Sequence, residues 1–591
     1  MRKERFMFYV AAVLTVAATP IWEKRMSNVV SAGPVRRRGS GKKLAMYFAM
    51  AMLAAAPRLL AQPAITAVEN AASNLDPRLP NAGIAQGAIF VVYGKGLGPS
   101  NIAIAPAAFQ STTLSNTSVA VTMGGTTVNA PLYYTSAGQV AALLPSNTPT
   151  GTGTITVTSN NQTSAKAPIT VVANNLAIFT VDSTGAGPGL VTYADYSLVS
   201  SFKAANCGGP NTTCGAANPG DTLILWGTGL GPISGSDASG AGLGVNMPNI
   251  PLTIWLGGVQ APVTYQGRSG CCIGEDQIVF TVPNNVPTGC AVPLAVQINN
   301  QVSNTTVMPI AIGSRTCTQV SSPGIDVSQL STAGSFTLGS VELDHFINDN
   351  GNGFFDKAKA LFVKISGLPA TSQALLASYL DNEPFGACTV FGANSPGDVF
   401  FNNLANNGNV ALLDGGSSFT ITGPKGAMTV QVPPGGQTVL TSSSAFLVPG
   451  DYTYAGSGGK DVGPFTAHIT VPVTPTLTSP AGPQNVTVTR SKGMTVTWSP
   501  NGATGHVEIV ILDFIDQNTA AQVACAAPAS AGTFTIPPYV LQALPATNGA
   551  IFYFGSGDQS PAFSSTFTAT GLTTGIAQSF VDGVRLGMVV N

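Results

Sequence analysis

Along most of the chain, short segments either alternate apolar with polar residues or are continuously apolar. Residues 119–123 read Val-Ala-Val-Thr-Met and residues 155–158 read Ile-Thr-Val-Thr, with a bulky apolar residue at every second position. Gly-Gly, Asn-Asn and Pro-Thr-Gly separate such segments at intervals of about 8–14 residues. This period of two, interrupted by turn residues, predicts an all-β fold built from β-sandwiches.

One stretch of the pattern occurs twice. Gly87-Ala-Ile-Phe-Val-Val-Tyr-Gly-Lys-Gly-Leu-Gly-Pro99 returns 133 residues later as Gly220-Asp-Thr-Leu-Ile-Leu-Trp-Gly-Thr-Gly-Leu-Gly-Pro232. Each copy continues with a Gly-Gly pair, an Ala-Pro-x-x-Tyr segment, and a Gln-Val or Gln-Ile segment leading to Pro-Thr-Gly. A repeat of this length predicts two tandem copies of one small β-domain.

The glycines of the repeated stretch do not form a dinucleotide-binding fingerprint. Their spacing, Gly-x-Gly-x-Gly, is wrong for that motif, and a proline and a polar loop follow in place of a helix. Glycine permits positive φ, so this segment is better interpreted as a bend at the corner of a sandwich.

Composition supports several β-domains. A chain of 591 residues is too long for one core, and roughly four domains are expected. Only 9% of the residues are charged, whereas 67 are Gly and 42 are Pro, which disfavours helical bundles. The 44% of hydrophobic residues, arranged in regular segments, argues against disorder over most of the chain.

The charge is distributed unevenly. Residues 1–61 contain 11 of the 25 basic residues and 2 of the 26 acidic ones, which leaves 14 basic against 24 acidic residues in the remainder, a net charge of −10. Nucleic-acid binding needs clustered Lys and Arg, so we expect no nucleic-acid partner.

The N-terminal 61 residues resemble an export signal. A basic segment at 36–43 precedes an apolar run at 44–56, and Leu-Leu-Ala at 59–61 is a plausible cleavage site. The run is shorter than the roughly 20 residues of a membrane span. Residues 1–61 are therefore predicted to be a signal-peptide region, with a possible misassigned translation start upstream, and the mature chain to be secreted or held at the cell surface without a membrane span.

The chain has eight cysteines, none of them in the first repeat. They are Cys207, Cys214, Cys271, Cys272, Cys290, Cys317, Cys388 and Cys525. Their spacing does not match zinc modules, so disulfides in an oxidising compartment are favoured over a metal site. Cys207 and Cys214 are expected to close a small loop, but the remaining connectivity does not follow from the sequence.

The repeated landmarks resemble a family of secreted bacterial repeats of unknown function, the Solibacter-type domains allied to the Ig-like IPT/TIG fold. The resemblance covers about 250 residues and includes the Gly-Gly hairpin and the Gly138-Gln139-Val140 segment followed by Pro145. It implies an Ig-like fold and export. It implies no activity and no catalytic residues.

The C-terminal half resembles the companion module that follows such repeats. Pro-Gly-Asp-Tyr at 449–452 and Phe-Thr-Ile-Pro-Pro-Tyr at 534–539 carry this resemblance, and one cysteine occurs in each part. A Cys388–Cys525 disulfide is the pairing we favour. Trp498, on an alternating strand, is predicted to be buried between the sheets of a fibronectin-III-like or Ig-like unit.

Candidate chemistry is sparse. His345, His468 and His506 lack partners at ligand spacing, and no Gly-x-Ser-x-Gly elbow is present, so no catalytic residues are assigned. Oxygen ligands occur together only in a segment with Asn348, Asn350, Asn352 and Asp356, a weak calcium candidate. A polar hairpin turn is the favoured interpretation of that segment, and no cofactor is expected.

Together these observations predict an exported protein made of tandem Ig-like or fibronectin-III-like sandwiches, like beads on a string. The expected units are 63–181 (repeat 1), 182–317 (Cys-rich repeat 2), 318–475 (a β-rich domain) and 484–591 (a fibronectin-III/Ig-like domain). The expected role is structural or adhesive and not enzymatic, with a protein or polysaccharide bound through loops or sheet edges. The alternative is a carbohydrate-binding or carbohydrate-processing accessory protein, with Tyr133, Tyr134, Trp255 and Tyr265 as candidate aromatic platforms. Any specialised surface is expected in the loops 205–216 and 267–275.

Overall fold

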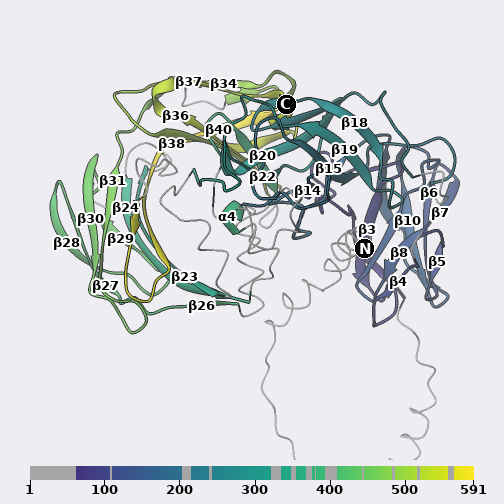
Figure 1. Ribbon diagram of the computed structural model, residues 1–591, viewed down its shortest axis with the longest axis horizontal. Coiled ribbons are helices and arrows are strands. Elements are labelled where there is room, and N and C mark those ends of the chain that lie inside the picture. Colours follow the sequence, from purple (N-terminus) through teal and green to yellow (C-terminus); the bar gives the residue numbers. More distant parts are fainter. Residues whose placement is uncertain are drawn as a thin grey trace, which may run out of the picture.

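The protein is nearly all β, as predicted; two sheets pack together in each repeat, and two small sheets cover one large sheet in the C-terminal half (Figure 1). The computed structural model describes residues 62–106, 109–201, 214–237, 243–320, 335–347, 354–367, 376–379, 381, 383–392, 409–441, 445–481, 486–515, 520–556 and 565–591. The predicted signal-peptide region, residues 1–61, lies outside this part of the chain. No helix in the described ranges is long and apolar enough to cross a membrane.

The first sandwich contains two sheets. One has the order β1 (Ala64–Asn70), β3 (Ile89–Lys95), β9 (Gln139–Leu143), β8 (Leu132–Thr135), β4 (Ala103–Ile104). The other has the order β2 (Ile84–Ala85), β12 (Ala167–Val172), β10 (Gly151–Ser159), β6 (Thr117–Met123), β5 (Thr113–Leu114), with β11 (Gln162–Thr163) beside β10 and β7 (Thr126–Ala130) beside β6. The inward side chains of both sheets form one core, which includes Phe90, Val121 and Val157.

The second sandwich repeats this plan. One sheet has the order β13 (Ala177–Ile178), β15 (Thr222–Thr228), β19 (Asp276–Thr281), β18 (Val263–Arg268), with β14 (Val191–Thr192) beside β15. The other has the order β17 (Val259–Ala261), β16 (Leu252–Leu256), β20 (Gly289–Ile298), β21 (Gln301–Val302), with β22 (Thr306–Ile310) beside β20. Because β13 pairs with β15, residues from about 177 onward already belong to the second sandwich, and the boundary predicted at 181 lies too late.

The C-terminal half is built on one large sheet and two small ones. The large sheet has the order β25 (Cys388–Gly392), β36 (Ala520–Pro528), β35 (His506–Phe514), β38 (Thr547–Ser556), β40 (Thr574–Val590), β23 (Ser335–Ile347), β24 (Phe354–Ser366), β26 (Val410–Leu412). In addition, β29 (Gly436–Thr441) pairs with β24, and both β33 (Val486–Val488) and β39 (Ser565–Phe567) pair with β40. One small sheet contains β28 (Gly426–Gln431), β27 (Ser418–Gly423), β30 (Gly450–Gly456) and β31 (Phe465–Val471). The other contains β32 (Thr476–Ser479), β34 (Met494–Ser499) and β37 (Thr533–Ile536).

The large sheet corrects the predicted division between residues 475 and 484. The first half of β40 pairs in parallel with β23, and its second half pairs antiparallel with β38, so one strand belongs to both predicted units. Each small sheet covers a different part of this shared sheet and forms its own core. The last two units therefore form one continuous structure and do not fold as separate beads.

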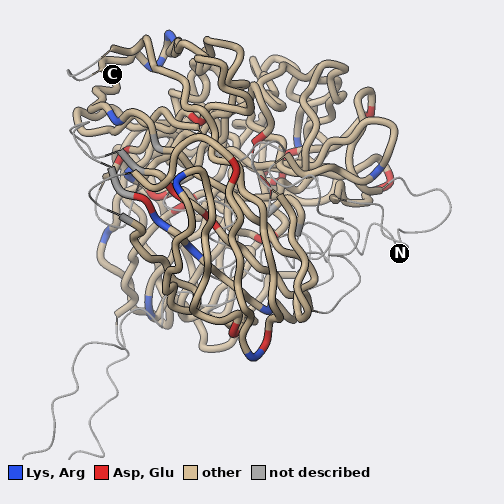
Figure 2. The backbone as a smooth tube through the Cα atoms, turned by 90° about the vertical axis from the view of Figure 1, so that its left-hand side faces the viewer, with Lys and Arg blue, Asp and Glu red and all other residues tan. Residues whose placement is uncertain are grey.

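Short helical elements complete the fold. They are α4 (Leu376–Tyr379), α6 (Pro538–Leu541), and the 3-10 turns η3 (Arg490–Lys492) and η4 (Ala529–Ala531). Trp498 of β34 is 4% exposed, as predicted for a residue between two sheets, and its indole N–H donates to the carbonyl of Ala529 at 2.6 Å. Charged residues are few along the described part of the backbone (Figure 2).

The repeated turns have the predicted roles. Gly124-Gly125 joins β6 to β7, and Gly257-Gly258 joins β16 to β17, with positive φ at all four glycines. The Gly-x-Gly-Leu-Gly-Pro segment begins in the last two residues of β3 in one copy and of β15 in the other. Its leucine is fully buried in both copies, at positions 97 and 230, so the segment anchors a sandwich corner.

Three disulfides join described cysteines, and one of them links the two predicted C-terminal units. Cys388 of β25 is bonded to Cys525 of β36, the pairing favoured from the sequence, and Cys290 is bonded to Cys317. Cys271 and Cys272 are bonded to each other. Cys214 is also disulfide-bonded, but its predicted partner Cys207 lies outside the described residues.

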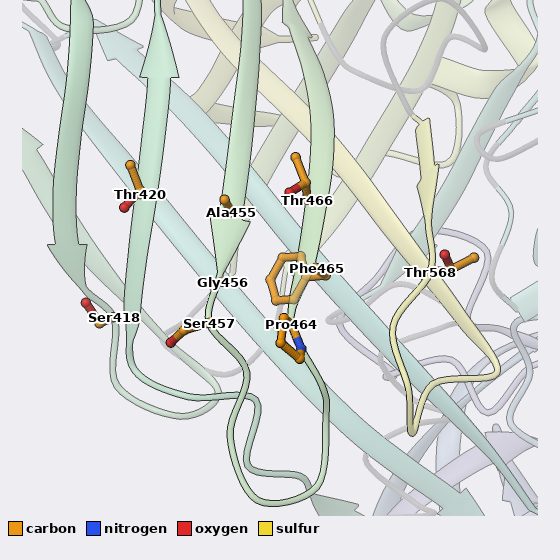
Figure 3. Close-up of a pocket in the computed structure, with 9 residues that line it drawn as sticks. All are labelled: Ser418, Thr420, Ala455, Gly456, Ser457, Pro464, Phe465, Thr466 and Thr568. Atoms are coloured by element: carbon orange, nitrogen blue, oxygen red, sulfur yellow. The ribbon is translucent and has the colours of Figure 1, made fainter.

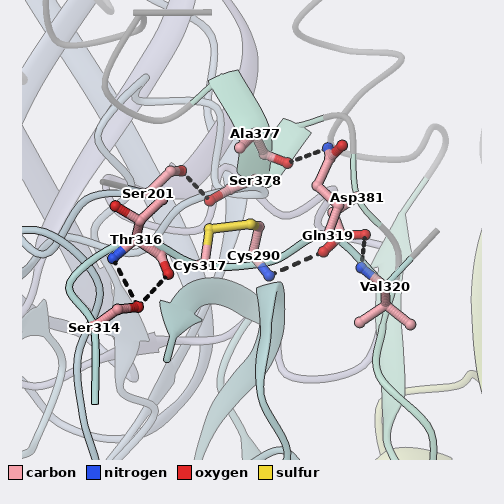
Figure 4. Close-up of a disulfide and its surroundings, with 10 residues drawn as sticks. All are labelled: Ser201, Cys290, Ser314, Thr316, Cys317, Gln319, Val320, Ala377, Ser378 and Asp381. Atoms are coloured by element: carbon pink, nitrogen blue, oxygen red, sulfur yellow. Dashed lines mark hydrogen bonds between the residues drawn. A yellow bond between two sulfur atoms is a disulfide. The ribbon is translucent and has the colours of Figure 1, made fainter. Parts of the chain in front are cut away.

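The Cys290–Cys317 disulfide also marks where the α4 region contacts the second sandwich (Figure 4). Asp381 accepts the backbone N–H of Cys290 at 2.9 Å and that of Val320 at 2.8 Å. Gln319 donates to the carbonyl of Ala377 at 3.2 Å. The chain after the second repeat is thus fixed to the repeat that precedes it.

Candidate functional site

The most elaborate cluster of polar side chains lies between the two repeats, on the loop that joins β18 to β19. We call this region, defined by Ser146, Asp237, Arg268, Cys271, Cys272, Glu275 and Asp276, the inter-repeat junction. The first copy has no counterpart of the inserted loop, because its Ala-Pro-x-x-Tyr segment leads into Gly138-Gln139 after three residues. The inter-repeat junction includes the loop 267–275, one of the two loops in which the sequence predicts a specialised surface.

The first repeat holds the loop in place. The hydroxyl of Tyr133 donates to the carbonyl of Ile273, and Tyr133 is 2% exposed. The hydroxyl of Thr228 donates to the carbonyl of Gly274 at 2.6 Å and accepts the N–H of Ile89 at 2.8 Å. The loop of the second copy is therefore bonded to strands of both copies.

Arg268 is the central cation of the junction. It is 1% exposed, Nη1 bonds the carboxylate of Asp276, and Nη2 donates to the carbonyl of Gly231 at 2.6 Å. Nη2 also lies 4.0 Å from the carboxylate of Asp237, which is 6% exposed. Removing an arginine from water is costly, so these buried partners are what make its position stable.

Asp237 extends the network into the first repeat. Its carboxylate accepts the backbone N–H of Ser146 at 2.6 Å and the hydroxyl of Ser146 at 2.7 Å. The same hydroxyl accepts the N–H of Ile233 at 3.0 Å. Charge-assisted bonds of this kind are stronger than neutral ones, so the network fixes the orientation of the two repeats.

Two neighbouring carboxyls differ in their partners. Asp276 bonds Arg268 and accepts the N–H of Leu230 at 2.6 Å; burial raises its pKa, and these two partners oppose the increase. Glu275 is fully buried, and neither carboxyl oxygen has a hydrogen-bond partner. Burial raises the pKa of Glu275 to about 8, and the charge of Asp276 adds to it. The nearby Ser269 hydroxyl partly offsets the increase, although its geometry falls short of a hydrogen bond to either carboxyl oxygen.

The vicinal cysteines lie beside Glu275. One carboxyl oxygen of Glu275 and the sulfur atoms of Cys271 and Cys272 all lie within 4.8 Å of one another. Cys272 is 8% exposed, while Cys271 is half-buried and follows the exposed Gly270. The Cys271–Cys272 disulfide is therefore partly accessible to solvent and lies next to the buried carboxyl of Glu275.

The first glycine of the repeated motif meets this network in only one of the two copies. Gly87 and Gly220 hold the same position in the two copies, with φ of 74° and 87°. A Cβ on Gly87 would overlap Nη2 of Arg268, whereas one on Gly220 would meet nothing within 4 Å. Alanine substitutions at these two glycines therefore distinguish the cost of a side chain in a left-handed backbone conformation from the cost of disturbing the junction.

We expect Gly87→Ala to destabilise the repeats more than Gly220→Ala. Both variants place a side chain at positive φ, at about 1 kcal/mol each, but only Gly87→Ala overpacks Arg268, at about 1–3 kcal/mol more. Urea unfolding of the oxidised mature chain measures the difference. Equal losses in the two variants would show that Arg268 does not need this space.

Of the weak calcium candidates, only Asp356 lies in the part of the chain that the structure describes. Asn348, Asn350 and Asn352 lie outside the described residues. Asp356 is fully buried, and its carboxylate is bonded to Nδ1 of His345 at 2.6 Å and to the N–H groups of Phe446 and Leu447 at 2.6 and 2.8 Å. Asp356 therefore serves as an internal hydrogen-bond acceptor.

The other two histidines occupy different environments. His506 is fully buried, neither ring nitrogen has a hydrogen-bond partner, and burial lowers its pKa to about 4. His468 lies on an exposed position of β31, where alternation along the strand places it. Because His506 is buried and His468 is exposed on β31, these two side chains do not belong to one site.

The candidate aromatic platforms are not free surfaces. Tyr133 and Tyr134 are each 2% exposed, and Tyr265 is half-buried and donates to the carbonyl of Arg268 at 3.1 Å. Trp255 is half-buried and stacks on Tyr539 of the C-terminal half, with ring centroids 4.5 Å apart. These rings serve packing within and between units.

An open depression lies in the C-terminal half (Figure 3). It has a volume of about 650 Å³ and is lined mainly by small and hydroxyl-bearing side chains, with Pro464 and Phe465 beside them. The lining comes from β27, β30, β31 and the segment after β39. The depression is shallow and contains no charged side chain in its lining.

Reasoning from the sequence missed Ser146, Asp237 and Arg268. Nothing in their local pattern distinguishes them from surface residues. The available signal was the comparison of the two copies, because Arg268 and Asp276 flank the insertion that only the second copy carries.

The comparisons with known proteins do not identify the chain. No family model matches it, and no curated protein matches it. Solved structures with a likeness include the titin I9–I11 tandem (8% identity, 65% of this chain and 92% of that chain, TM-score 0.12) and domains 5–6 of the S-layer protein SbsC (16% identity, 43% and 100%, TM-score 0.16). A 1.5-MDa bacterial ice-binding adhesin has 10% identity, 64% and 95% coverage and a TM-score of 0.11. These TM-scores are too low to add to the fold described above.

Proposed function

We propose that this chain is an exported, non-catalytic protein with a structural or adhesive role, in which stiffly joined β-sandwiches present loops and sheet edges to a protein or polymer partner. The observation that carries the proposal is the inter-repeat junction. Interfaces between domains of one chain usually permit motion. Here a buried arginine, two aspartates and a serine fix one repeat against the other.

Further contacts extend this stiffness to the C-terminal half. Trp255 stacks on Tyr539, and Gln297 donates to Gln542 at 3.1 Å, which joins the second repeat to the last part of the chain. The Cys388–Cys525 disulfide and the shared large sheet hold that half together. A stiff assembly of sandwiches suits a spacer or scaffold, and the described histidines offer no shared catalytic site.

The carbohydrate alternative has less support. Its four candidate rings are buried or already stacked and bonded within the protein. Stacking on sugars needs an exposed ring face. The depression of Figure 3 contains only Phe465 as an aromatic lining residue, and that ring is 5% exposed.

Two measurements test the proposal. Residues 1–61 fused to a reporter enzyme that is active only outside the cytoplasm should give activity in a bacterial host, and a fusion with the 36–43 basic residues neutralised should not. The mature chain, added to cells of the producing bacterium, should be retained at their surface. Loss of retention after protease treatment identifies a protein partner, and loss after glycosidase treatment a polymer. Turnover in a hydrolase panel, or a reporter that stays inside the cell, would contradict the proposal.

A further inference from the structure

We propose that Cys271, Cys272 and Glu275 form a redox-gated site for a zinc-like divalent cation. With the disulfide closed, the site is shut. When the disulfide is reduced, two thiolates and one carboxylate face a common point at the surface end of the inter-repeat junction. This inference stands independently of the proposed structural or adhesive role.

The geometry fits a small tetrahedral cation. The two sulfur atoms and a carboxyl oxygen of Glu275 lie within 4.8 Å of one another. Zinc binds cysteine sulfur at about 2.3 Å and carboxylate oxygen at about 2.0–2.2 Å, so the two sulfur atoms must separate after reduction before the three donors can share one ion. Two thiolates with a carboxylate favour zinc over calcium or magnesium, which prefer oxygen alone.

Glu275 is the group that points to a ligand. It is fully buried, and both carboxyl oxygens lack a hydrogen-bond partner, an arrangement that is costly without a cation or a proton. The polar groups around it are already engaged: Asp276 with Arg268, and the Tyr133 hydroxyl with the carbonyl of Ile273. Among the carboxyl groups of the junction, Glu275 has two oxygens without a partner; Nε of Arg268 is a further buried atom without one.

Access is also built in. Cys271 is half-buried, whereas the cysteines of the other two fully described disulfides are at most 3% exposed. A small reductant therefore reaches the vicinal pair before it reaches Cys290–Cys317 or Cys388–Cys525. The exposed Gly270 next to Cys271 leaves room for a water molecule as the fourth ligand.

The chemistry balances with a thiol reductant. A small dithiol supplies two electrons and two protons, the sulfur–sulfur bond breaks, and the reductant leaves as its own disulfide. The cation then displaces one proton from each thiol and one from the Glu275 carboxyl, forming two metal–sulfur bonds and one metal–oxygen bond. Binding therefore releases about three protons per ion at neutral pH.

The test uses the full mature chain and zinc ions. We expect the chain treated with mild reductant, without denaturant, to bind about one zinc ion in equilibrium dialysis, and the oxidised chain to bind none at this site. Mass spectrometry after alkylation establishes that the vicinal pair is reduced and the other disulfides are intact. A Cys271→Ser/Cys272→Ser variant treated identically should lose this binding.

Glu275→Gln separates the proposed site from a plain dithiol. Loss of a ligand should weaken zinc binding by at least about tenfold and reduce the release to about two protons. Glu383→Gln is the matched control, because Glu383 is also buried with a carboxyl oxygen lacking a partner and a pKa raised to about 8 by burial. That variant should bind zinc like the unaltered chain.

Four results would overturn the proposal. They are equal binding by the oxidised and reduced chains, binding that survives in the double cysteine variant, equal affinities of Glu275→Gln and Glu383→Gln, and a vicinal pair that is reduced only when the chain unfolds. Circular dichroism of the unaltered chain before and after reduction identifies the last case.

Discussion

Replacing Arg268 with alanine is expected to lower the free energy of unfolding of the repeats by about 3–5 kcal/mol. The variant leaves the carboxylates of Asp276 and Asp237 buried without their cation, since these side chains are 0% and 6% exposed. It also removes the donor to the carbonyl of Gly231. Breaking a buried ion pair from one side costs more than the pair contributes, because the remaining charge stays out of water.

Arg315→Ala is the control for this variant. Arg315 pairs with Asp221 in the second repeat, but its side chain is 27% exposed, and water replaces it when it is lost. We expect this variant to cost about 1 kcal/mol or less. Hydrogen exchange of peptides from residues 62–320 at increasing urea concentration assigns each loss to the repeats. Equal effects of the two variants would show that the junction is not a stabilising network.

A double variant shows where the cost arises. In Arg268→Met/Asp276→Asn the buried charge of Asp276 is removed together with its partner, and the new amide still accepts the N–H of Leu230. We expect it to recover more than half of the stability lost in Arg268→Ala, because paired apolar or neutral replacements are nearly neutral. If the double variant loses as much unfolding free energy as Arg268→Ala, the loss arises from packing around Arg268 and not from the unpaired charge of Asp276.

The sequence predicted the parts of the fold that local patterns encode. A period of two identified the strands of both repeats, and Gly-Gly marked the hairpins between β6 and β7 and between β16 and β17. Alternation placed Trp498 on the inner face of β34. These features depend on residues close together in the chain, so one sequence is enough to predict them.

The shared sheet could not be predicted in the same way. The parallel pairing of β23 with β40 joins residues more than 200 positions apart, for example Val341 with Ala577. The predicted division between residues 475 and 484 rested on a segment rich in proline and threonine, yet Thr476–Ser479 of that segment form β32 of a small sheet. No local signal shows that the strands on either side of it continue into one sheet.

The inter-repeat junction was located but not described. Comparing the two copies singled out the loop at 267–275 as the place where they differ. What the sequence did not contain was the partnership of Arg268 with Asp237 and of Asp237 with Ser146, which lies 91 positions away. Burial of those charges is a property of two docked domains, and neither repeat alone specifies it.

Glu275→Gln is expected to stabilise the oxidised chain, and increasingly so as pH rises. The folded chain holds the Glu275 proton until about pH 8, whereas the unfolded chain releases it near pH 4.5. Between these values the folded state binds more protons than the unfolded state, so stability falls as pH rises. The expected cost of the native glutamate reaches about 3 kcal/mol by pH 7, and it is absent below about pH 4.5.

The measurement is the difference in unfolding free energy between the variant and the unaltered chain at pH 4.5, 6 and 7.5 in urea, with no metal present. Taking differences cancels the other buried carboxyls, including Glu69 and Glu383, whose pKa values burial also raises to about 8. If the unfolding free energies of Glu275→Gln and the unaltered chain differ by the same amount at every pH, the Glu275 carboxyl has a partner in solution. The junction would then lack the unpartnered carboxyl on which the proposed cation site depends.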